Sequence, residues 1–332
     1  MNVLVTGGAG YIGSQTSKAL ARAGHKPVAY DNLSRGHASA VRWGPLIQAD
    51  IADAASLAAA MQKWRIESVL HFAGFAYVGE SMQEPGNYFT NNVTNTLTLL
   101  EAMRRCGVGQ LIYSSSCATY GLPQSSPIAE THPQVPINPY GESKLMAEHM
   151  IRWFGAVYGL RWVTLRYFNA AGADPEGEIG EHHVPETHLI PLAIESALAG
   201  EPLPIYGTDH PTADGTAIRD YTHVADLADA HVRALAHLER SGESRAFNLG
   251  SGCGSSVYDV VRAVVNTGGK IVPVREFPRR PGDPPELIAD AGMARRCLGW
   301  HPRFSGLETI VRDAWAWRVT EPVHEVAAAV EG

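Results

Sequence analysis

The sequence is poor in cysteine, in positive charge and in long apolar runs. Its four cysteines, Cys106, Cys117, Cys253 and Cys297, lie far apart and form no CxxC pair, which argues against a disulfide framework and against a cysteine zinc site. The net charge is −7, whereas a non-specific nucleic-acid binder normally carries a basic surface. No apolar run approaches the roughly 20 residues of a membrane span. We therefore expect a cytoplasmic protein with reduced thiols and no nucleic-acid or membrane partner.

The chain does have ample material for a core. It has 332 residues, of which 45% are hydrophobic and 18% charged, as in a globular protein of two domains or of one large domain with a second lobe. From Met1 to about Asn169, short apolar runs alternate with amphipathic stretches, which is typical of a parallel sheet with helices on both faces. The sequence therefore predicts an α/β fold: a doubly wound (Rossmann) parallel sheet in domain 1–170, with a smaller C-terminal α/β lobe.

Strands and helices alternate regularly in the first domain. Strands are expected over residues 3–5, 26–30, 46–49, 68–72, 110–113 and 162–165. Helices are expected over residues 12–23, 54–64, 93–105 and 140–158. Because these strands would run parallel, a ligand should bind beyond their carboxyl ends, where the strand order reverses.

The composition changes after residue 170. Residues 170–220 are rich in Gly, Pro, Asp and His, which predicts a lobe built of loops rather than of further sheet. The stretch 224–250 is a candidate to return to the first domain, which would make the lobe, 171–332, discontinuous. Ser305 and Glu308 fit a capping box at the start of the last helix. The elements predicted here are helices over 190–198, 224–238, 255–265 and 307–317 and a strand over 245–249.

The opening segment, MNVLVTGGAGYIG, joins a predicted strand to a predicted helix through glycines. Gly7, Gly10 and Gly13 permit a tight turn that a Cβ would obstruct. The helix that then begins with Tyr11 and Ile12 offers unpaired backbone N–H groups and a dipole that favour an anion such as a pyrophosphate. On its own the pattern also fits an ordinary strand-to-helix turn. The choice between this turn and a nucleotide site therefore depends on the rest of the chain.

Polar residues after the next strands fit a dinucleotide. Asp31 lies 18 positions after Gly13, near the ~20-residue offset at which a carboxylate accepts hydrogen bonds from the adenosine ribose. Its charge would repel a 2′-phosphate, which favours NAD over NADP, although Arg35 is a residue type that accommodates such a phosphate. Further cofactor-facing candidates, which fit packing and turns equally well, are Asn32, Asp50, Ile51, Phe72, Ala73 and Gly74.

A serine, a tyrosine and a lysine form the candidate catalytic group. The fifth strand leads into Ser116, and YGESK, 24 positions later, places Tyr140 and Lys144 four apart on one face of a helix. A phenol, with a pKa of about 10, is a poor base at neutral pH unless a cation stabilises the phenolate, and Lys144 is placed to do so. Ser116 could pass a proton between the phenol and a substrate hydroxyl. Each residue alone has an ordinary structural explanation, but their joint order favours catalysis.

Motifs along essentially the whole chain carry a resemblance. The motifs are GGAGYIG, DN, HFAG, NNV, SSSCATYG, YGESK, LRYFNAAGA, GEHHVPETHLIPL, YGTDHPTADGTAIRDYTHVADLADAH, FNLGSG and RRPGDPPELIAD. They resemble those of the extended short-chain dehydrogenase/reductase family, and specifically those of its UDP-hexose 4-epimerases. The resemblance implies a tightly bound NAD, regenerated within each turnover, that serves the interconversion of UDP-glucose and UDP-galactose through a transient 4-keto sugar.

The resemblance also implies roles for individual residues. Tyr140 would take the proton of the sugar 4-hydroxyl with the help of Ser116, and Lys144 would bind the nicotinamide ribose and lower the tyrosine pKa. Arg219 and Arg280 match positions that contact the substrate diphosphate, where a guanidinium fork suits two phosphate oxygens. Asn91 and Tyr167 are the remaining matched cofactor positions, and Asn169, His188, Leu189, Tyr206, Asp283 and Leu287 the remaining matched substrate positions.

Three histidines, His182, His183 and His188, raise the question of a metal. Their stretch lacks the helical HExxH geometry, a paired carboxylate pattern and any zinc spacing, so no metal is expected. The resemblance places this stretch at the uridine side of the substrate. Without the resemblance, the three histidines are explained as ordinary polar side chains of a loop or a pocket.

Two positions depart from some family members. Ala76 stands where certain epimerases carry a lysine near the cofactor, so that the retention of NAD becomes a question for this chain. Leu287 is intermediate between a tyrosine, which restricts the pocket to UDP-glucose and UDP-galactose, and a small residue, which admits N-acetylated sugars. The hypothesis from Leu287 is some turnover of UDP-N-acetylglucosamine.

Three other functions fit parts of this sequence pattern. A 4,6-dehydratase needs an Asp-Glu pair after the strand-five hydroxyl, where this chain has Cys117 and Ala118. A non-catalytic dinucleotide sensor would have lost the tyrosine and the lysine, which are present. An epimerase of a UDP-pentose or UDP-uronate is left open, and so is the pathway, either galactose breakdown or glycan precursor supply. The resemblance further implies a homodimer, with helices 93–105 and 140–158 paired across a two-fold axis.

Overall fold

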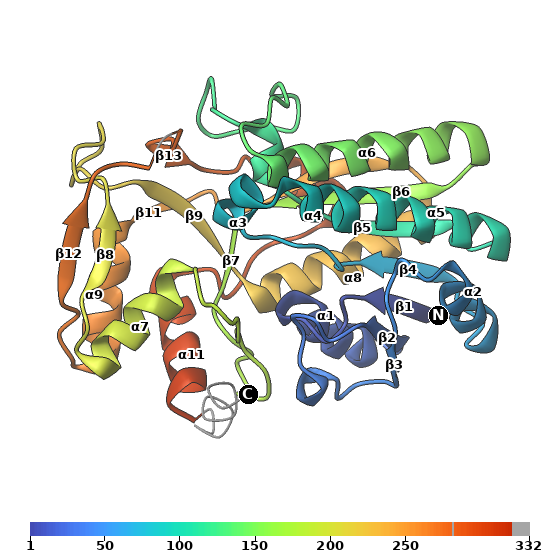
Figure 1. The fold of residues 1–332 in the computed structure, drawn as a ribbon, viewed down its shortest axis with the longest axis horizontal. Helices are drawn as coiled ribbons and strands as arrows, with labels where there is room; N and C mark the ends of the chain where they lie inside the picture. The colour runs from blue at the N-terminus through green and yellow to red at the C-terminus, as the bar shows by residue number, and fades with distance from the viewer. Residues whose placement is uncertain (281, 321–332) are drawn as a thin grey trace.

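The computed structural model describes residues 1–280 and 282–320; Pro281 and the end of the predicted lobe, 321–332, lie outside the described residues. The largest sheet has seven strands, and Figure 1 shows it in the part of the molecule that contains the N-terminus. The strands are β1 (Asn2–Thr6), β2 (Lys26–Asp31), β3 (Leu46–Gln48), β4 (Ser68–His71), β5 (Gln110–Ser116), β6 (Arg161–Tyr167) and β10 (Arg245–Leu249).

The strand order is β10-β6-β5-β4-β1-β2-β3, and every neighbouring pair runs parallel. β1 pairs with β2 on one side and with β4 on the other, so the order reverses there, as in a doubly wound sheet. The predicted fold class is therefore confirmed. All six predicted strands are present, and the seventh, β10, is the strand predicted over 245–249.

Side chains alternate along the strands between two apolar cores. In β1, Val3 and Val5 pack into one core and Leu4 into the other, and all three are fully buried. In Figure 1, α5 and α6 lie in the upper part of the molecule and α1 and α8 lie lower down. The first face is covered by α1 (Tyr11–Arg22), α8 (Val224–Ser241) and α10 (Gly292–Leu298), and the second by α2 (Ala54–Lys63), α5 (Asn95–Cys106) and α6 (Pro139–Tyr158).

Short helical segments lie between these elements. They are η1 (Ala38–Ala40), α3 (Val78–Gln83), α4 (Pro85–Phe89), η2 (Thr90–Thr94) and η3 (Cys117–Tyr120). The segment η2 is a π-helical turn, so the helix predicted over 93–105 begins as a regular α-helix only at Asn95. Such turns are rare and frequently lie at functional sites.

The smaller lobe, on the left in Figure 1, contains two further sheets. One is formed by β7 (Asn169–Ala171), β9 (Ile218–His223), β11 (Gly254–Ser256) and β13 (Glu286–Leu287), and the other by β8 (Leu203–Tyr206) and β12 (Val274–Phe277). The lobe helices are α7 (Leu189–Ala199), α9 (Val257–Gly268) and α11 (Leu307–Thr320). The predicted α/β lobe is therefore present, and the expectation of loops rather than sheet over residues 170–220 was wrong only at β7, β8 and the start of β9. These strands have two to six residues and pair with distant segments, so no local pattern reveals them.

The caps of two lobe helices also differ from expectation. Ser305, predicted to cap α11, donates its hydroxyl to the carboxylate of the buried Asp226 at 2.7 Å, and the carbonyl oxygen of Gly306 accepts the first backbone bond of the helix. The carboxylate outcompetes the helix for this serine. A capping box does occur at α9, where Ser256 and Asp259 each accept a bond from the other's backbone N–H.

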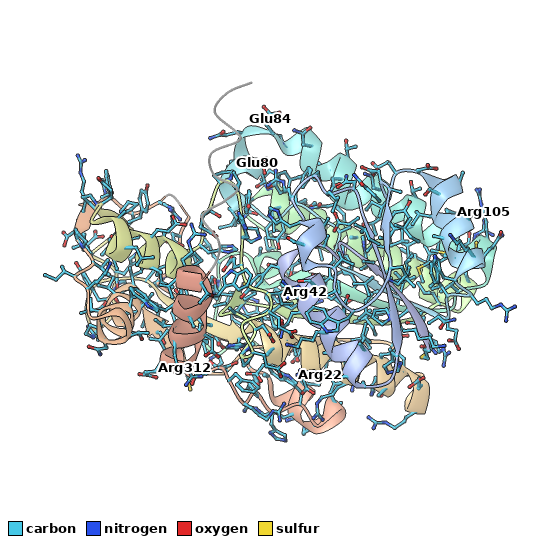
Figure 2. All side chains as sticks on the ribbon, turned by 90° about the horizontal axis from the view of Figure 1, so that it is seen from below. Arg22, Arg42, Glu80, Glu84, Arg105 and Arg312 are labelled. Atoms are coloured by element: carbon cyan, nitrogen blue, oxygen red, sulfur yellow. The ribbon has the colours of Figure 1, made fainter. Side chains whose placement is uncertain are left out.

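Charged side chains lie around the outside of the molecule. Arg22, Arg105 and Arg312 lie well apart in Figure 2, with 59%, 70% and 62% of their side chains exposed. Such exposed charges are solvated and contribute little to stability individually. Over the part of the chain that the structure describes, no helix is both long enough and apolar enough to cross a membrane.

Candidate active site

The glycine turn between β1 and α1 lies against the chain that follows β4. Gly7 has a φ of 72°, and a Cβ on it would lie 2.6 Å from the backbone nitrogen of Ala73. A Cβ on Gly13 would lie 2.2 Å from the carbonyl oxygen of Gly7. Only glycine allows backbone segments to approach this closely, so the two glycines are required by the crossing.

The helix α1 leaves this turn without a side-chain cap. Gly10 precedes its first turn and donates its N–H to the carbonyl oxygen of Gly7 at 3.1 Å. The side chain of Ile12 packs against the core, and the Tyr11 hydroxyl donates to the carbonyl oxygen of Gly172 at 2.5 Å. Uncapped N–H groups at the positive end of a helix suit an anion, so the turn fits a dinucleotide pyrophosphate.

Asp31 ends β2 beside this turn. Its carboxylate is 9% exposed and accepts hydrogen bonds from the N–H groups of Ala9 and Leu33 at 3.0 and 2.9 Å. Burial raises the pKa of this carboxyl, and the two N–H groups oppose the shift. The carboxylate is thus fixed at the point where β2 meets the glycine turn, as a ribose contact requires.

Asn32, Asp50 and Ile51 lie next to Asp31, at the ends of β2 and β3. The Asn32 amide donates to the Asp50 carboxylate at 2.7 Å, and the Tyr30 hydroxyl donates to the Asp50 carbonyl oxygen at 3.0 Å. Ile51 is 4% exposed and packs into the second core. These contacts hold the two loops that would border an adenine ring.

Arg35 is held by contacts within the protein. Its guanidinium donates to both carboxylate oxygens of Glu80, at 2.6 and 2.8 Å. It also lies over the rings of Phe75 and Tyr77, at 4.4 and 4.7 Å from their centroids. Arg35 is thus held by a carboxylate and two aromatic rings of the protein itself, which favours NAD over NADP at this position.

Phe72, Ala73 and Gly74 cross over the glycine turn after β4. The N–H groups of Phe72 and Ala73 both donate to the carbonyl oxygen of Thr6, at 2.9 and 3.1 Å. A Cβ on Gly74 would lie 3.2 Å from Lys144 Nζ, so the glycine leaves room for the ammonium group. The loop after β4 therefore contacts both the predicted pyrophosphate site and the predicted catalytic lysine.

Asn92 ties this loop to α6. Its side chain accepts from the N–H of Phe75 at 2.8 Å and donates to the Phe75 carbonyl oxygen and the Ser143 hydroxyl, both at 3.0 Å. It lies in the π-helical turn and is 1% exposed. The resemblance pointed to its neighbour Asn91, which is only partly buried and donates to Asn92 at 3.0 Å. The NNV motif contained both residues, but nothing in it showed which one is buried.

Ser116, Tyr140 and Lys144 come together where β5 ends and α6 begins. The side chain of Asn138 caps α6 by accepting from the N–H of Gly141 at 2.8 Å, which fixes where the helix starts. Tyr140 is the second residue of the helix, and Lys144 follows one turn later on the same face. The Ser116 hydroxyl lies close enough to the Tyr140 phenol to lower its pKa.

The pKa of Tyr140 differs from expectation, because it is raised rather than lowered. Burial raises the pKa of the Tyr140 phenol to about 12, against the effect of Ser116. Burial also lowers the pKa of the Lys144 ammonium to about 8, which Glu148 opposes. Lys144 donates to the carbonyl oxygen of Ser114 at 2.9 Å, and within the described residues it makes no hydrogen bond to Tyr140. The chain alone therefore keeps the phenol protonated.

A buried ion pair behind the catalytic group joins α6 to the sheet. The Arg166 guanidinium donates to both carboxylate oxygens of Glu148, at 2.9 and 2.5 Å, and both side chains are at most 5% exposed. The Ser115 hydroxyl, next to Ser116, donates to the same carboxylate at 2.6 Å. Sequence reasoning missed this pair, although Glu148 lies on the same face of α6 as Tyr140 and Lys144, at successive spacings of four.

Tyr167 lies at the end of β6, beside the catalytic group. Its hydroxyl hydrogen-bonds the Ser114 hydroxyl. The buried His231 of α8 packs against both Tyr167 and Phe72, at centroid distances of 5.9 and 4.6 Å. Two residues that the sequence assigned to the cofactor therefore meet across one imidazole ring.

Four predicted substrate residues lie on one small sheet or next to it. Asn169 of β7 pairs with Tyr221 of β9, and Arg219 of β9 pairs with Leu287 of β13. The Arg219 guanidinium donates to the Asp283 carboxylate at 2.5 Å. The small sheet thus brings together residues more than a hundred positions apart.

Tyr206 and Arg280 form a second group at the other lobe sheet. Tyr206 stacks on Phe277 at a centroid distance of 5.5 Å, and Arg280 lies 4.1 Å above the Tyr206 ring. The N–H of Asp283 donates to the carbonyl oxygen of Arg280 at 3.2 Å, which links the two groups. A stacked aromatic platform beside a guanidinium suits a base next to phosphates.

His188 and Leu189 open the helix α7. Leu189 packs against the lobe core, and the His188 ring is hydrogen-bonded to the Glu181 carboxylate. Burial opposes protonation of this imidazole, but Glu181 raises the pKa of His188 to about 9. At neutral pH the His188 ring is therefore a cation paired with a buried anion.

Leu287 contacts the region around the catalytic serine. It packs against a small apolar cluster that includes Cys117, the residue after Ser116, together with Ile128 and Phe168. Burial raises the pKa of the Cys117 thiol to about 12, so it is an unreactive thiol there. The position that the sequence linked to sugar size thus lies behind the catalytic serine.

The fold and the site together define a class. The sheet is doubly wound, with an uncapped glycine turn after β1 and a carboxylate at the end of β2. A serine, a tyrosine and a lysine meet where β5 ends and α6 begins. This is the arrangement of an extended short-chain dehydrogenase/reductase.

Comparison with known proteins narrows the class. Residues 3–250 match the sequence model of the NAD dependent epimerase/dehydratase family. The UDP-glucose 4-epimerase of Rhizobium leguminosarum bv. trifolii is 49% identical over 323 residues, 97% of this chain and 98% of that protein. The Brucella ovis UDP-glucose 4-epimerase in complex with NAD superposes with a TM-score of 0.93 at 53% identity, over 95% of this chain and 97% of that one. The Bifidobacterium longum enzyme, in complex with NAD⁺ and UDP, gives a TM-score of 0.92 at 35% identity, over 97% and 99%. The chain belongs to the NAD dependent epimerase/dehydratase family, among its UDP-glucose 4-epimerases.

Replacing Asn92 by alanine is expected to destabilise the protein by about 2 kcal/mol, because a buried amide, a carbonyl and a hydroxyl would lose their hydrogen-bond partners. Urea unfolding of the cofactor-free protein measures the change. Asn91→Ala is the matched control and should change the unfolding free energy by less than about 0.5 kcal/mol. Equal losses in the two variants would contradict the structural role assigned to Asn92.

Proposed function

We propose that the chain interconverts UDP-glucose and UDP-galactose at carbon 4, with NAD held and regenerated within each turnover. The observation that carries the proposal is the meeting of Ser116, Tyr140 and Lys144 at the carboxyl end of β5, in a chain 49% identical to a UDP-glucose 4-epimerase over nearly its whole length. A cytoplasmic location and a homodimeric state are part of the proposal.

NAD, when bound, accepts a hydride from the sugar, returns it to the opposite face, and contributes the positive charge of its nicotinamide ring. The uncapped start of α1 at Gly10 would hold the pyrophosphate, and Asp31 the adenosine ribose. Lys144, beside Gly74, would hold the nicotinamide ribose. The proposed cofactor site thus lies at the carboxyl ends of the strands of the large sheet, with further groups from the start of α1 and from α6.

Tyr140 is the proposed base for the sugar 4-hydroxyl. With a pKa of about 12 in the chain alone, its phenol needs positive charge nearby before it can ionise. Lys144 and the hydrogen bond of Ser116 favour the phenolate, and Ser116 relays the proton between the substrate oxygen and the phenol. The same phenol returns the proton when the 4-keto oxygen is reduced on the other face.

Substrate affinity is proposed to lie at the nucleotide end. Arg219 and Arg280 would bind the diphosphate, Asp283 the uridine ribose, and Tyr206 the base. The sugar must turn over between the two half-reactions, so it has to be held loosely while the nucleotide stays fixed. We assign this task to the lobe within 171–332, whose two sheets carry Arg219 on β9 and Tyr206 on β8.

Purified protein given UDP-glucose without added NAD is expected to form UDP-galactose, because the cofactor stays bound between turnovers. Tyr140→Phe should lower kcat by about 10²–10⁴-fold, since only the base is lost. Product analysis by anion-exchange chromatography checks both statements. Unchanged turnover in Tyr140→Phe would refute the catalytic assignment, and strict dependence on added NAD would show that this chain, with Ala76, does not retain it.

The sugar range is proposed to depend on Leu287. UDP-N-acetylglucosamine should be epimerised by the wild type, and Leu287→Tyr should lower its kcat/KM relative to that of UDP-glucose by about tenfold or more through lost space. Leu287→Ala should shift the same ratio the opposite way. The ratio is measured with both substrates on each variant, so that a general loss of activity cancels. A ratio unchanged in both variants would exclude Leu287 as the determinant.

The proposed dimer would use an exposed apolar face of α6 and α5. Trp153 and Val157 on α6 are 69% and 62% exposed, and Met146 and the α5 residue Leu97 are 39% and 41% exposed. In Figure 1, α5 and α6 lie side by side on the outside of the sheet. A second copy related by a two-fold axis would bury both helices at once.

Trp153→Glu is expected to weaken the dimer by about 2 kcal/mol or more, about 30-fold in Kd, since it places a charge at the centre of an apolar interface. Light scattering coupled to size-exclusion chromatography measures the mass. Arg312→Glu, a charge change at an exposed position of α11 outside both helices, is the control. A monomeric wild type would refute the proposed dimer.

A further inference from the structure

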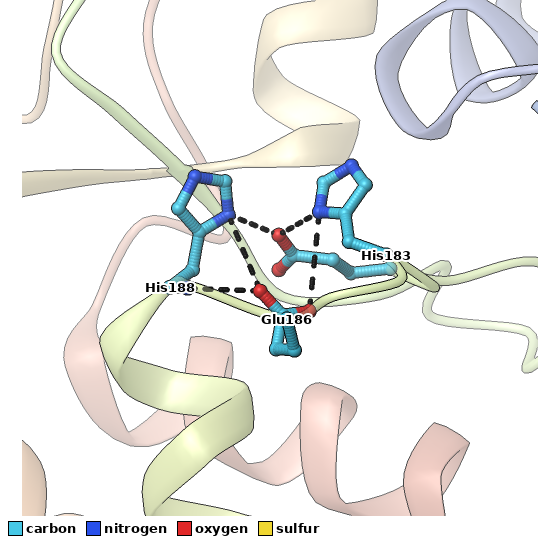
Figure 3. A group of neighbouring side chains, drawn as sticks. His183, Glu186 and His188 are labelled. Carbon is cyan, nitrogen blue, oxygen red and sulfur yellow. Dashed lines mark hydrogen bonds and ion pairs between the residues drawn. The ribbon is translucent and has the colours of Figure 1, made fainter. Parts of the chain in front are cut away.

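The segment 181–188 brings two imidazole rings and two carboxylates close together. The side-chain ligand atoms of Glu181, His183, Glu186 and His188 all lie within 4.8 Å of one another. In Figure 3, the rings of His183 and His188 approach the carboxylate of Glu186 from opposite sides. The histidines of this segment raised the question of a metal, but the two glutamates could not be recognised as their partners, because the four residues are spaced by two, three and two along an irregular loop.

The distances between these atoms lie on both sides of the spacing in a four-coordinate metal site. His183 Nδ1 lies 3.1 Å from Glu181 Oε1 and 3.9 Å from Glu186 Oε2, and His188 Nδ1 lies 4.0 Å from Glu186 Oε1 and in contact with Glu181 Oε1. Metal-to-ligand bonds of 2.0–2.1 Å in a tetrahedron place neighbouring ligand atoms roughly 3.4 Å apart. Small rotations of the side chains would bring the four atoms to this spacing.

The cluster buries two carboxylates beside two imidazoles. The carboxylates of Glu181 and Glu186 are only 5% and 9% exposed, and burying two carboxylates side by side is costly. The His188 imidazolium compensates one of these two charges. The buried Nδ1 of His183 faces both carboxylates and has no hydrogen-bond partner among the described residues. This nitrogen and the second carboxylate are therefore placed to ligate a metal ion.

A second acidic cluster in the same region differs from this one in its cation. Asp174, Glu176 and Glu178 also converge, but the ammonium group of Lys18 lies among them, at 2.6 Å from Asp174 and 3.1 Å from Glu176. In the described ion pairs, neither Glu181 nor Glu186 has a lysine or an arginine as partner. Among the described residues, the second cluster thus holds a lysine, whereas the first holds only the His188 imidazolium, which can give up its proton when a metal binds.

We propose that Glu181, His183, Glu186 and His188 form a four-ligand site for a divalent transition-metal ion of the zinc type. Imidazole nitrogen and carboxylate oxygen both ligate zinc, and two carboxylates neutralise its charge in a buried site. Four protein ligands leave no open position, so the ion is structural rather than catalytic. The expectation of no metal rested on the absence of HExxH geometry, of a paired carboxylate pattern and of a zinc spacing, whereas this proposal rests on side chains that the loop brings together.

The ion would fix the loop against the glycine turn. The His183 ring makes edge contacts with Tyr11, the first residue of α1, and with Tyr77, at centroid distances of 6.3 and 5.8 Å. His188 begins the lobe helix α7. A metal bound between these histidines therefore connects the start of α1 to the start of α7, and so joins the large sheet to the lobe.

The test uses full-length protein without a histidine tag, dialysed against EDTA and titrated with Co²⁺ as a visible probe for a zinc site. The wild type should bind one Co²⁺ per chain with four-coordinate absorption bands, a Kd of about 1 µM or lower, and displacement by Zn²⁺. His183→Ala and the more conservative Glu186→Gln should each weaken binding at least about tenfold. His182→Ala removes the adjacent histidine outside the cluster and should bind as the wild type does.

Thermal unfolding gives a second readout that does not depend on activity. Zn²⁺ should raise the Tm of the wild type and of His182→Ala, but not that of His183→Ala. No saturable Co²⁺ uptake by the wild type would overturn the proposal, whether or not the variants fold. Uptake and stabilisation that persist in both His183→Ala and Glu186→Gln would overturn it as well, because the ion would then lie elsewhere.

Discussion

The close crossing of the backbone at the glycine turn is the constraint on which the rest of the structure depends. The turn after β1 lies so near the chain after β4 that no side chain fits at Gly7, and α1 returns so near the turn that none fits at Gly13. This contact lies where the strand order reverses, and it brings the start of α1 next to the ends of β2 and β4. The same loop after β4 reaches Lys144 through Gly74, so the position of the predicted catalytic lysine depends on the position of the turn.

Buried hydrogen bonds connect the glycine turn to the predicted catalytic group. Asn92 joins the loop after β4 to α6, and the Glu148–Arg166 pair joins α6 to β5 and β6. Each bond is buried, where an unmade partner is costly, so these contacts fix the orientation of α6 more than they add to overall stability. The face that carries Tyr140 and Lys144 is thereby held against Ser116.

What the sequence could predict depended on how local the determining contacts are. The large sheet was predictable because its strands and helices carry their own periodicity, and Tyr140 and Lys144 were predictable because they share one helix. The small sheet with Asn169, Arg219 and Leu287 could not be read from local pattern, since its strands pair across long stretches of chain. The choice between Asn91 and Asn92 and the convergence of Glu181 with Glu186 depend on side-chain directions set by tertiary packing.

The placement of β10 determines when this protein can fold during synthesis. β10 is the last strand of the large sheet to be made, and it covers the edge of β6, which was completed about eighty residues earlier in the chain. Until Arg245–Leu249 has left the ribosome, the buried residues of β6 present an open, apolar sheet edge of the kind that invites aggregation. The lobe strands β7 to β9 emerge during that interval, so the nascent chain must carry an unfinished sheet while the lobe forms.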